Sequence, residues 1–134
     1  MKTILFACVA NAGRSQMAAA LFNDMADPAT ARAVSAGTRP AGAVHSVVVE
    51  VMHEMGIDLS STSPRKLTQE LARDADLLIT MGCGDECPVV PGLRRDDWPL
   101  PDPAEQPLER VREIRDEIRD RVRALLDSEG WGRP

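Results

Sequence analysis

The chain has few cysteines, a minority of positive charges and no long hydrophobic run, and each shortage removes a class of protein. Three cysteines are an odd number in 134 residues, which argues against a secreted framework of disulfides. The 16 Lys and Arg residues against 21 Asp and Glu residues argue against nucleic acid or an anionic membrane as partner. The apolar run at residues 4–10 is too short to span a membrane and lacks a signal-peptide cleavage pattern. We therefore expect a cytoplasmic protein with reduced thiols.

What the chain contains is an alternation of short apolar stretches with helix-like patterns. The expected strands are residues 3–7, 31–37, 76–81 and 96–100, the last of them at an edge. The expected helices are residues 15–26, 42–56, 67–75 and 108–126, with Ser15 available as the first N-cap. This alternation predicts an α/β fold in one three-layer domain, residues 1–134, with a four-stranded parallel sheet flanked by helices.

The sequence CVANAGRS, residues 8–15, connects the first expected strand to the first expected helix. Backbone N–H groups of a tight Ala- and Gly-rich loop can converge on one point, and the helix N-terminus adds positive potential. The loop has neither the G-x-x-x-x-G-K-[ST] pattern of nucleotide-binding loops nor the G-x-G-x-x-G pattern of dinucleotide folds. It predicts an oxyanion site formed by Val9, Ala10, Asn11, Ala12, Gly13 and Arg14.

Cys8 is the candidate nucleophile of this loop. The surrounding N–H donors, the helix terminus and Arg14 all favour a thiolate. Arg14 can present its planar guanidinium to two oxygens of a tetrahedral anion, and Ser15 can hydrogen-bond the thiolate while Asn11 holds the shape of the loop. A cysteine at the end of a strand is otherwise a small hydrophobic residue, and the spacing to Arg14 and Ser15 favours the catalytic interpretation.

Together with the sequence SAG at residues 35–37 and the pair Asp102-Pro103, this loop resembles the low-molecular-weight protein tyrosine phosphatases and the arsenate reductases of the same fold. The resemblance covers nearly the whole chain. It implies that Asp102 is the general acid, which protonates the leaving oxygen while Cys8 attacks from the opposite side. Without the resemblance, an Asp before Pro would be interpreted as a turn residue.

Two further cysteines, Cys83 and Cys87, bear on which of the two activities the chain has. Both follow the third expected strand, so we expect them at the same rim of the sheet as Cys8. A phosphatase needs no further thiol, whereas a reductase must supply two electrons. The resemblance to three-cysteine, thioredoxin-coupled arsenate reductases implies Cys83 as the second nucleophile and Cys87 as the third. Gly82 and Gly84 permit the bend that a disulfide between them needs.

Three absences narrow the choice further. The chain has no tyrosine, and Ala104 and Glu105 follow Asp102-Pro103 where the phosphatases often carry aromatic residues, which disfavours a phosphotyrosine pocket. Some similar reductases bind potassium through an acidic side chain of the first helix, but residues 18–20 are all alanine. The cysteines also lack the C-x2-C pair of a zinc site. We therefore expect no metal and no cofactor.

The expected activity is the reduction of arsenate to arsenite, with phosphate or sulfate as competing anions. Hydrolysis of phosphate monoesters through a phosphocysteine is the alternative, and an oxyanion-binding protein without turnover is a third. An accessible Cys83–Cys87 disulfide would suit thioredoxin as the electron donor, whereas a single-cysteine scheme would use glutathione or mycothiol. The two histidines, His45 and His53, have no part in this mechanism.

Overall fold

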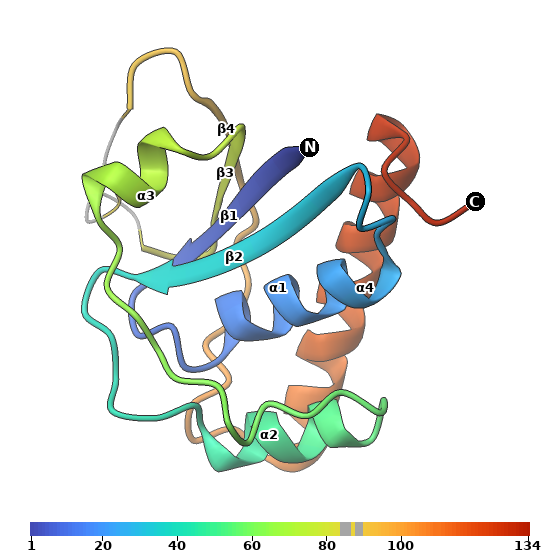
Figure 1. Cartoon of the computed structure of the whole chain (residues 1–134). Helices are drawn as coiled ribbons and strands as arrows, with labels where there is room; N and C mark the ends of the chain where they lie inside the picture. The colour runs from blue at the N-terminus through green and yellow to red at the C-terminus, as the bar shows by residue number, and fades with distance from the viewer. Residues whose placement is uncertain (84–86, 88–89) are drawn as a thin grey trace.

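The computed structural model describes residues 1–83, 87 and 90–134, and its centre is a sheet of four parallel strands (Figure 1). The strands are β1 (Lys2–Cys8), β2 (Ala31–Gly37), β3 (Leu77–Thr80) and β4 (Arg94–Asp97). Their order in the sheet is β2-β1-β3-β4, and every neighbouring pair is parallel. The predicted α/β fold with a four-stranded parallel sheet is therefore confirmed.

Helices cover both faces of the sheet (Figure 1). The helices are α1 (Arg14–Met25), α2 (Ser46–His53), α3 (Gln69–Arg73) and α4 (Leu108–Glu129). Ile4, Phe6 and Cys8 of β1 belong to the hydrophobic core that contains residues of α1, α2 and α4. The alternate residues, Leu5 and Ala7, belong to the smaller core on the face of α3. A strand buried on both faces has no polar side, which explains its continuous apolar sequence.

The position of β1 fixes the start of the CVANAGRS loop. This strand lies between β2 and β3, with Cys8 opposite Gly37 and Ala7 opposite both Ala36 and Thr80. Hydrogen bonding on both sides holds the carboxyl end of the strand, and Cys8 is its last residue. The candidate nucleophile therefore stands at the carboxyl end of an inner strand, which is where ligands bind in parallel α/β folds.

Helix α4 packs an apolar stripe against the core and carries its charges outward. The buried stripe is formed by Val111, Ile114, Ile118, Val122 and Leu126. The helix ends three residues later than predicted, because residues 127–129 continue the last turn until Gly130 adopts the left-handed conformation at φ 72°. Within the described part of the chain, no helix combines the length and the apolar character needed to cross a membrane.

Several predicted boundaries differ from the structure, and the second helix, expected at residues 42–56, is the shorter α2. Ser15 is not an N-cap, because α1 already begins at Arg14 and the Ser15 hydroxyl turns toward Cys8 instead. The edge strand β4 lies at Arg94–Asp97, a few residues earlier than expected, and its four residues are exposed. The apolar side chain that suggested a strand, Trp98, packs in the core against Phe6, with ring centroids 5.5 Å apart.

Glu54 follows α2 and joins this helix to α4 through two arginines. Its carboxylate accepts hydrogen bonds from Arg112 at 2.6 Å and from Arg115 at 2.8 Å. The bond from Arg112, helped by Arg115, lowers the pKa of Glu54 from 4.5 to about 2. A carboxyl group whose pKa is depressed in the folded state stabilises the fold above its unfolded pKa, and this contribution is lost as the pH falls from 4.5 toward about 2.

Replacing Glu54 with glutamine is therefore expected to lower the urea midpoint of unfolding at pH 6 and to leave it close to that of the unmodified chain at pH 2. Urea titrations at both pH values measure this difference. Glu113→Gln is the control, because it removes only an exposed pair with Arg110 on the surface of α4. A deficit of Glu54→Gln that is equal at the two pH values would contradict the assignment.

Candidate active site

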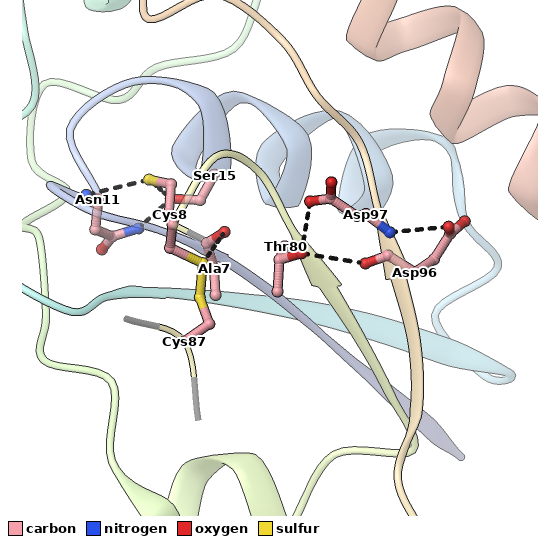
Figure 2. The surroundings of a disulfide bond; sticks show 9 residues. Ala7, Cys8, Asn11, Ser15, Thr80, Cys87, Asp96 and Asp97 are labelled. Carbon is pink, nitrogen blue, oxygen red and sulfur yellow. Dashed lines mark hydrogen bonds between the residues drawn. A yellow bond between two sulfur atoms is a disulfide. The ribbon is translucent and has the colours of Figure 1, made fainter. Parts of the chain in front are cut away.

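Cys8 is buried at the end of β1, and its sulfur is in contact with two groups of the following loop (Figure 2). The backbone N–H of Asn11 donates to the Cys8 Sγ at 3.3 Å. The Ser15 Oγ lies 2.8 Å from the same sulfur. The predicted contact between Ser15 and the nucleophile is thus present.

A backbone amide from a distant segment sets the direction of this network. The N–H of Arg65, which can only donate, lies 3.0 Å from the Asn11 Oδ1 and so identifies that atom as the oxygen. The Asn11 Nδ2 then donates to the Ser15 Oγ at 2.7 Å. Because Ser15 accepts there, its own proton is free to be donated to the Cys8 sulfur. The Cys8 sulfur is thus hydrogen-bonded by the Asn11 N–H and in contact with the Ser15 hydroxyl.

Gln16 is a buried member of the same network that the sequence analysis missed. Its Nε2 lies 3.1 Å from the backbone oxygen of Asn11 and 3.1 Å from the Asn11 Oδ1. Asn11 has φ 51°, a left-handed conformation that asparagine tolerates better than most residues. Gln16 therefore holds both the backbone and the side chain of Asn11. A polar residue among the alanines and methionines at the start of a core helix is the signal that could have revealed it.

The backbone of the loop has the polarity that an oxyanion site needs. Four of its carbonyls are turned outward and accept hydrogen bonds from segment 38–45. The bonds run from the N–H groups of Thr38, Arg39, Ala41 and His45 to the oxygens of Cys8, Val9, Ala10 and Ala12. In a trans peptide the next N–H points the opposite way, so the N–H groups of residues 9, 10, 11 and 13 point away from that segment. The Asn11 N–H meets the Cys8 sulfur, which shows that this is the catalytic side.

Gly37, the last residue of the SAG sequence, lets the loop lie against the end of β2. A Cβ built on Gly37 would come within 2.5 Å of the Val9 oxygen and 2.9 Å of the Asn11 nitrogen. Real Cβ atoms do not approach other atoms so closely, so any larger residue would push the loop away. The pairing of Gly37 with Cys8 in the sheet register explains why this glycine belongs to the site.

Arg14 and Asp102 come together over the loop, although they are far apart in the sequence. The Arg14 Nη1 donates to the Leu100 oxygen at 3.0 Å, and its Nη2 lies 3.9 Å from the Asp102 Oδ2. Pro103 touches the loop as well, because a Cβ built on Gly13 would lie 2.6 Å from the Pro103 Cγ. The predicted acid therefore stands beside the predicted anion-binding arginine, with its side chain 62% exposed.

Cys83 and Cys87 form a disulfide with a Cα–Cα distance of 5.6 Å, and Cys8 is the free thiol. The Cys83 sulfur lies 3.9 Å from the carbonyl oxygen of Ala7, so the pair lies beside the residue that precedes the nucleophile. It packs with Ala7 in the core on the α3 face, whereas Cys8 belongs to the opposite core (Figure 2). The expected rim is therefore correct, but the sulfurs lie on different faces of the sheet.

The Cys83–Cys87 disulfide is not accessible in this structure. Cys83 and Cys87 are 4% and 3% exposed, because both pack into the core on the α3 face. Gly84, the second glycine expected to permit the bend, lies outside the described residues.

A cavity of about 340 Å³ lies between α1, β2 and residues 59–65. Its lining includes Ala19, Ala20, Asn23, Ser35, Thr62 and Arg65. None of the lining residues is acidic, and Arg65 adds a positive charge, so these residues do not fit a potassium ion. Within the described ranges, no cluster of three or more His, Cys, Asp or Glu residues could hold a metal ion.

The chain is similar to arsenate reductases of three organisms. A candidate arsenate reductase of Halobacterium salinarum is 42% identical over 129 residues, which are 92% of this chain and 89% of that protein. A glutaredoxin arsenate reductase of Synechocystis is 33% identical, with 94% of this chain and 97% of that protein covered. The thioredoxin-dependent arsenate reductase of Corynebacterium glutamicum has a TM-score of 0.82 at 41% identity. It covers 96% of this chain, and this chain spans only 61% of it.

The family comparison matches residues 3–130 to the model described as low molecular weight phosphotyrosine protein phosphatase. This span includes the CVANAGRS loop, the disulfide pair and Asp102, and it leaves only a few residues at each end outside the match. The chain therefore belongs to the low molecular weight phosphotyrosine protein phosphatase family.

Proposed function

We propose that this chain reduces arsenate to arsenite through an intramolecular relay of its three cysteines. The observation that carries the proposal is the disulfide between Cys83 and Cys87 next to Ala7, with Cys8 as the free thiol. This is the thiol state in which such a relay ends. The names of the relatives reported above, several of them arsenate reductases, support the same activity.

The first step uses the residues around the loop. The Cys8 thiolate attacks the arsenic of arsenate, and an As–S bond forms as one As–O bond breaks. Arg14 and the inward N–H groups hold the other oxygens and stabilise their charge. Asp102 donates a proton to the departing oxygen, which leaves as water rather than as the poorer leaving group hydroxide.

The second and third steps are thiol exchanges that transfer two electrons. The Cys83 thiolate attacks the Cys8 sulfur, a Cys8–Cys83 disulfide forms, and the electron pair of the As–S bond stays with arsenic, which leaves as arsenite. The Cys87 thiolate then attacks Cys83 and releases the Cys8 thiolate. Arsenic gains two electrons, and the pair Cys83 and Cys87 loses them.

The relay requires Cys83 to move between two places. In the oxidised chain the Cys83 sulfur is buried beside Ala7 on the α3 face, whereas the sulfur of Cys8 lies on the opposite face of β1. Attack on Cys8 therefore needs Cys83 to pass around the carboxyl end of β1. We expect the Cys83 side chain to take a different position in the reduced chain.

A dithiol protein such as thioredoxin is the proposed electron donor, and the cytoplasm is the proposed location, because its thiol pool keeps such cysteines reduced. The burial of both sulfurs means that the donor reaches the disulfide only when this part of the chain opens. An enzyme that uses a monothiol donor needs no second and third cysteine of its own. The presence of Cys83 and Cys87 therefore favours a dithiol donor. Glutaredoxin should be tested as a donor beside thioredoxin, since one relative is named a glutaredoxin arsenate reductase.

A paired assay tests the activity against its alternative, phosphate monoester hydrolysis. We expect arsenate to drive oxidation of NADPH when thioredoxin and thioredoxin reductase are present, at a rate at least about tenfold above hydrolysis of p-nitrophenyl phosphate by the same preparation. Ala104 and Glu105, which follow Asp102-Pro103, give an aryl phosphate no aromatic side chain to stack on. Hydrolysis without arsenate-dependent oxidation would establish a phosphatase instead.

A further inference from the structure

Gly82 lies against the guanidinium of Arg14, the residue that is proposed to hold the oxyanion. It follows β3 directly after Met81 and precedes Cys83. Its φ is 90°, a conformation that disfavours any residue with a side chain. A Cβ built on Gly82 would lie 3.3 Å from the Arg14 Cζ and 3.6 Å from its Nη2, and it would overlap the Nη1.

The other neighbours of this guanidinium leave it little freedom. The Leu100 oxygen accepts a hydrogen bond from the Nη1, the Asp102 carboxylate lies near the Nη2, and the Arg14 side chain is 11% exposed. A guanidinium confined to one plane can offer two parallel N–H groups to an oxyanion with little further loss of side-chain entropy. A methyl group at position 82 would occupy the space of the Nη1 and push the guanidinium out of this plane.

We propose that Gly82 is a positioning residue of the oxyanion site, and that the lack of a side chain at this position lets Arg14 take the place from which it binds the anion. The proposal rests on the oxyanion site of the proposed function but not on arsenate turnover. It also makes the residue before the redox-active Cys83 part of the anion-binding apparatus. A substitution at position 82 therefore acts on anion binding through Arg14.

A matched pair of glycine variants separates this contact from backbone strain. Gly92 has φ 81°, close to that of Gly82, but no atom of the described residues beyond its chain neighbours lies within 4 Å of a Cβ built on it. Gly82→Ala and Gly92→Ala thus impose a similar left-handed strain, and only the first one collides with Arg14. The probe is inorganic phosphate, which protects Cys8 from alkylation by iodoacetamide. In the oxidised chain Cys8 is the thiol outside the disulfide, so alkylation reports on this residue.

In Gly82→Ala, the phosphate concentration that halves the alkylation rate is expected to rise at least tenfold. Gly92→Ala is expected to stay within twofold of the unmodified chain, while the urea midpoints of the two variants fall by similar amounts. Phosphate protection of Gly82→Ala within twofold of the unmodified chain would overturn the proposal. An equal loss of protection in both variants would overturn it as well, because the effect would then come from the backbone.

The unmodified oxidised chain gives a second test, which does not depend on the folding of a variant. In a sample with ¹⁵N-labelled arginine, nuclear Overhauser contacts are expected between the Hα protons of Gly82 and the guanidinium protons of Arg14. Addition of saturating phosphate is expected to retain them. Absence of these contacts in both the free and the phosphate-bound chain would overturn the proposal. Neither test requires arsenate, so a chain that fails to reduce arsenate can still confirm the role of Gly82.

Discussion

Replacing Cys8 with serine is expected to abolish arsenate reduction, including the first turnover, with a rate loss of more than about 10⁴-fold. The sulfur of Cys8 accepts a hydrogen bond from the Asn11 N–H and lies 2.8 Å from the Ser15 Oγ. A serine hydroxyl in the same place keeps its proton at neutral pH and is a far weaker nucleophile. Arsenite released by one equivalent of reduced enzyme, measured after acid quenching, is the readout.

The serine variant keeps the shape of the site, so anion binding serves as its control. Serine fits the space of cysteine, and Arg14 and the loop N–H groups are unchanged. We therefore expect Cys8→Ser to bind phosphate in calorimetry with an affinity within about tenfold of the unmodified chain. Release of a full equivalent of arsenite by this variant would show that another residue is the nucleophile.

Replacing Cys87 with serine is expected to leave the first turnover and to stop every later one when thioredoxin is the reductant. In the relay, arsenite leaves when Cys83 attacks Cys8, before Cys87 acts. The variant should therefore release one equivalent of arsenite and then remain as a Cys8–Cys83 disulfide. Steady-state NADPH oxidation is expected to fall more than about 100-fold. A mass-spectrometric map of the disulfides after stoichiometric arsenate measures the trapped state directly.

Cys83→Ser is the matched control, because it removes the other sulfur of the same pair. This variant is expected to release no arsenite, since it lacks the Cys83 thiolate that attacks the Cys8 sulfur of the As–S adduct. A map that shows a Cys8–Cys87 disulfide in Cys83→Ser, together with a full first turnover, would reverse the order of the two cysteines. Normal cycling of Cys87→Ser with thioredoxin would remove Cys87 from the relay altogether.

The local parts of the site could be predicted from the sequence because each depends on residues that are close along the chain. The loop from Cys8 to Ser15 joins a buried strand to a helix, and this order alone places a cysteine and an arginine at the N-terminus of α1. The long amphipathic pattern of α4 likewise reports which side of that helix is buried. The four-stranded parallel sheet follows from the same alternation of strands and helices.

The contacts that orient the site were decided by the tertiary structure. The Arg65 N–H, 54 residues from Asn11, identifies the orientation of the Asn11 amide and so makes Ser15 an acceptor of the Asn11 Nδ2. Arg14 is confined by the Leu100 oxygen and by the backbone of Gly82. These two residues lie 86 and 68 positions after Arg14 in the sequence. Backbone donors and acceptors are the same in every residue, so no sequence pattern marks the ones that will meet.

The sequence also could not predict on which face of the sheet each sulfur lies. The spacing of Cys83 and Cys87 allowed a disulfide, and the topology placed it at the same end of the sheet as Cys8. Only the packed structure puts it against Ala7, on the α3 face and out of contact with solvent. Sequence order determines which strand end a loop follows, whereas the face that a loop covers depends on which core has room for its side chains.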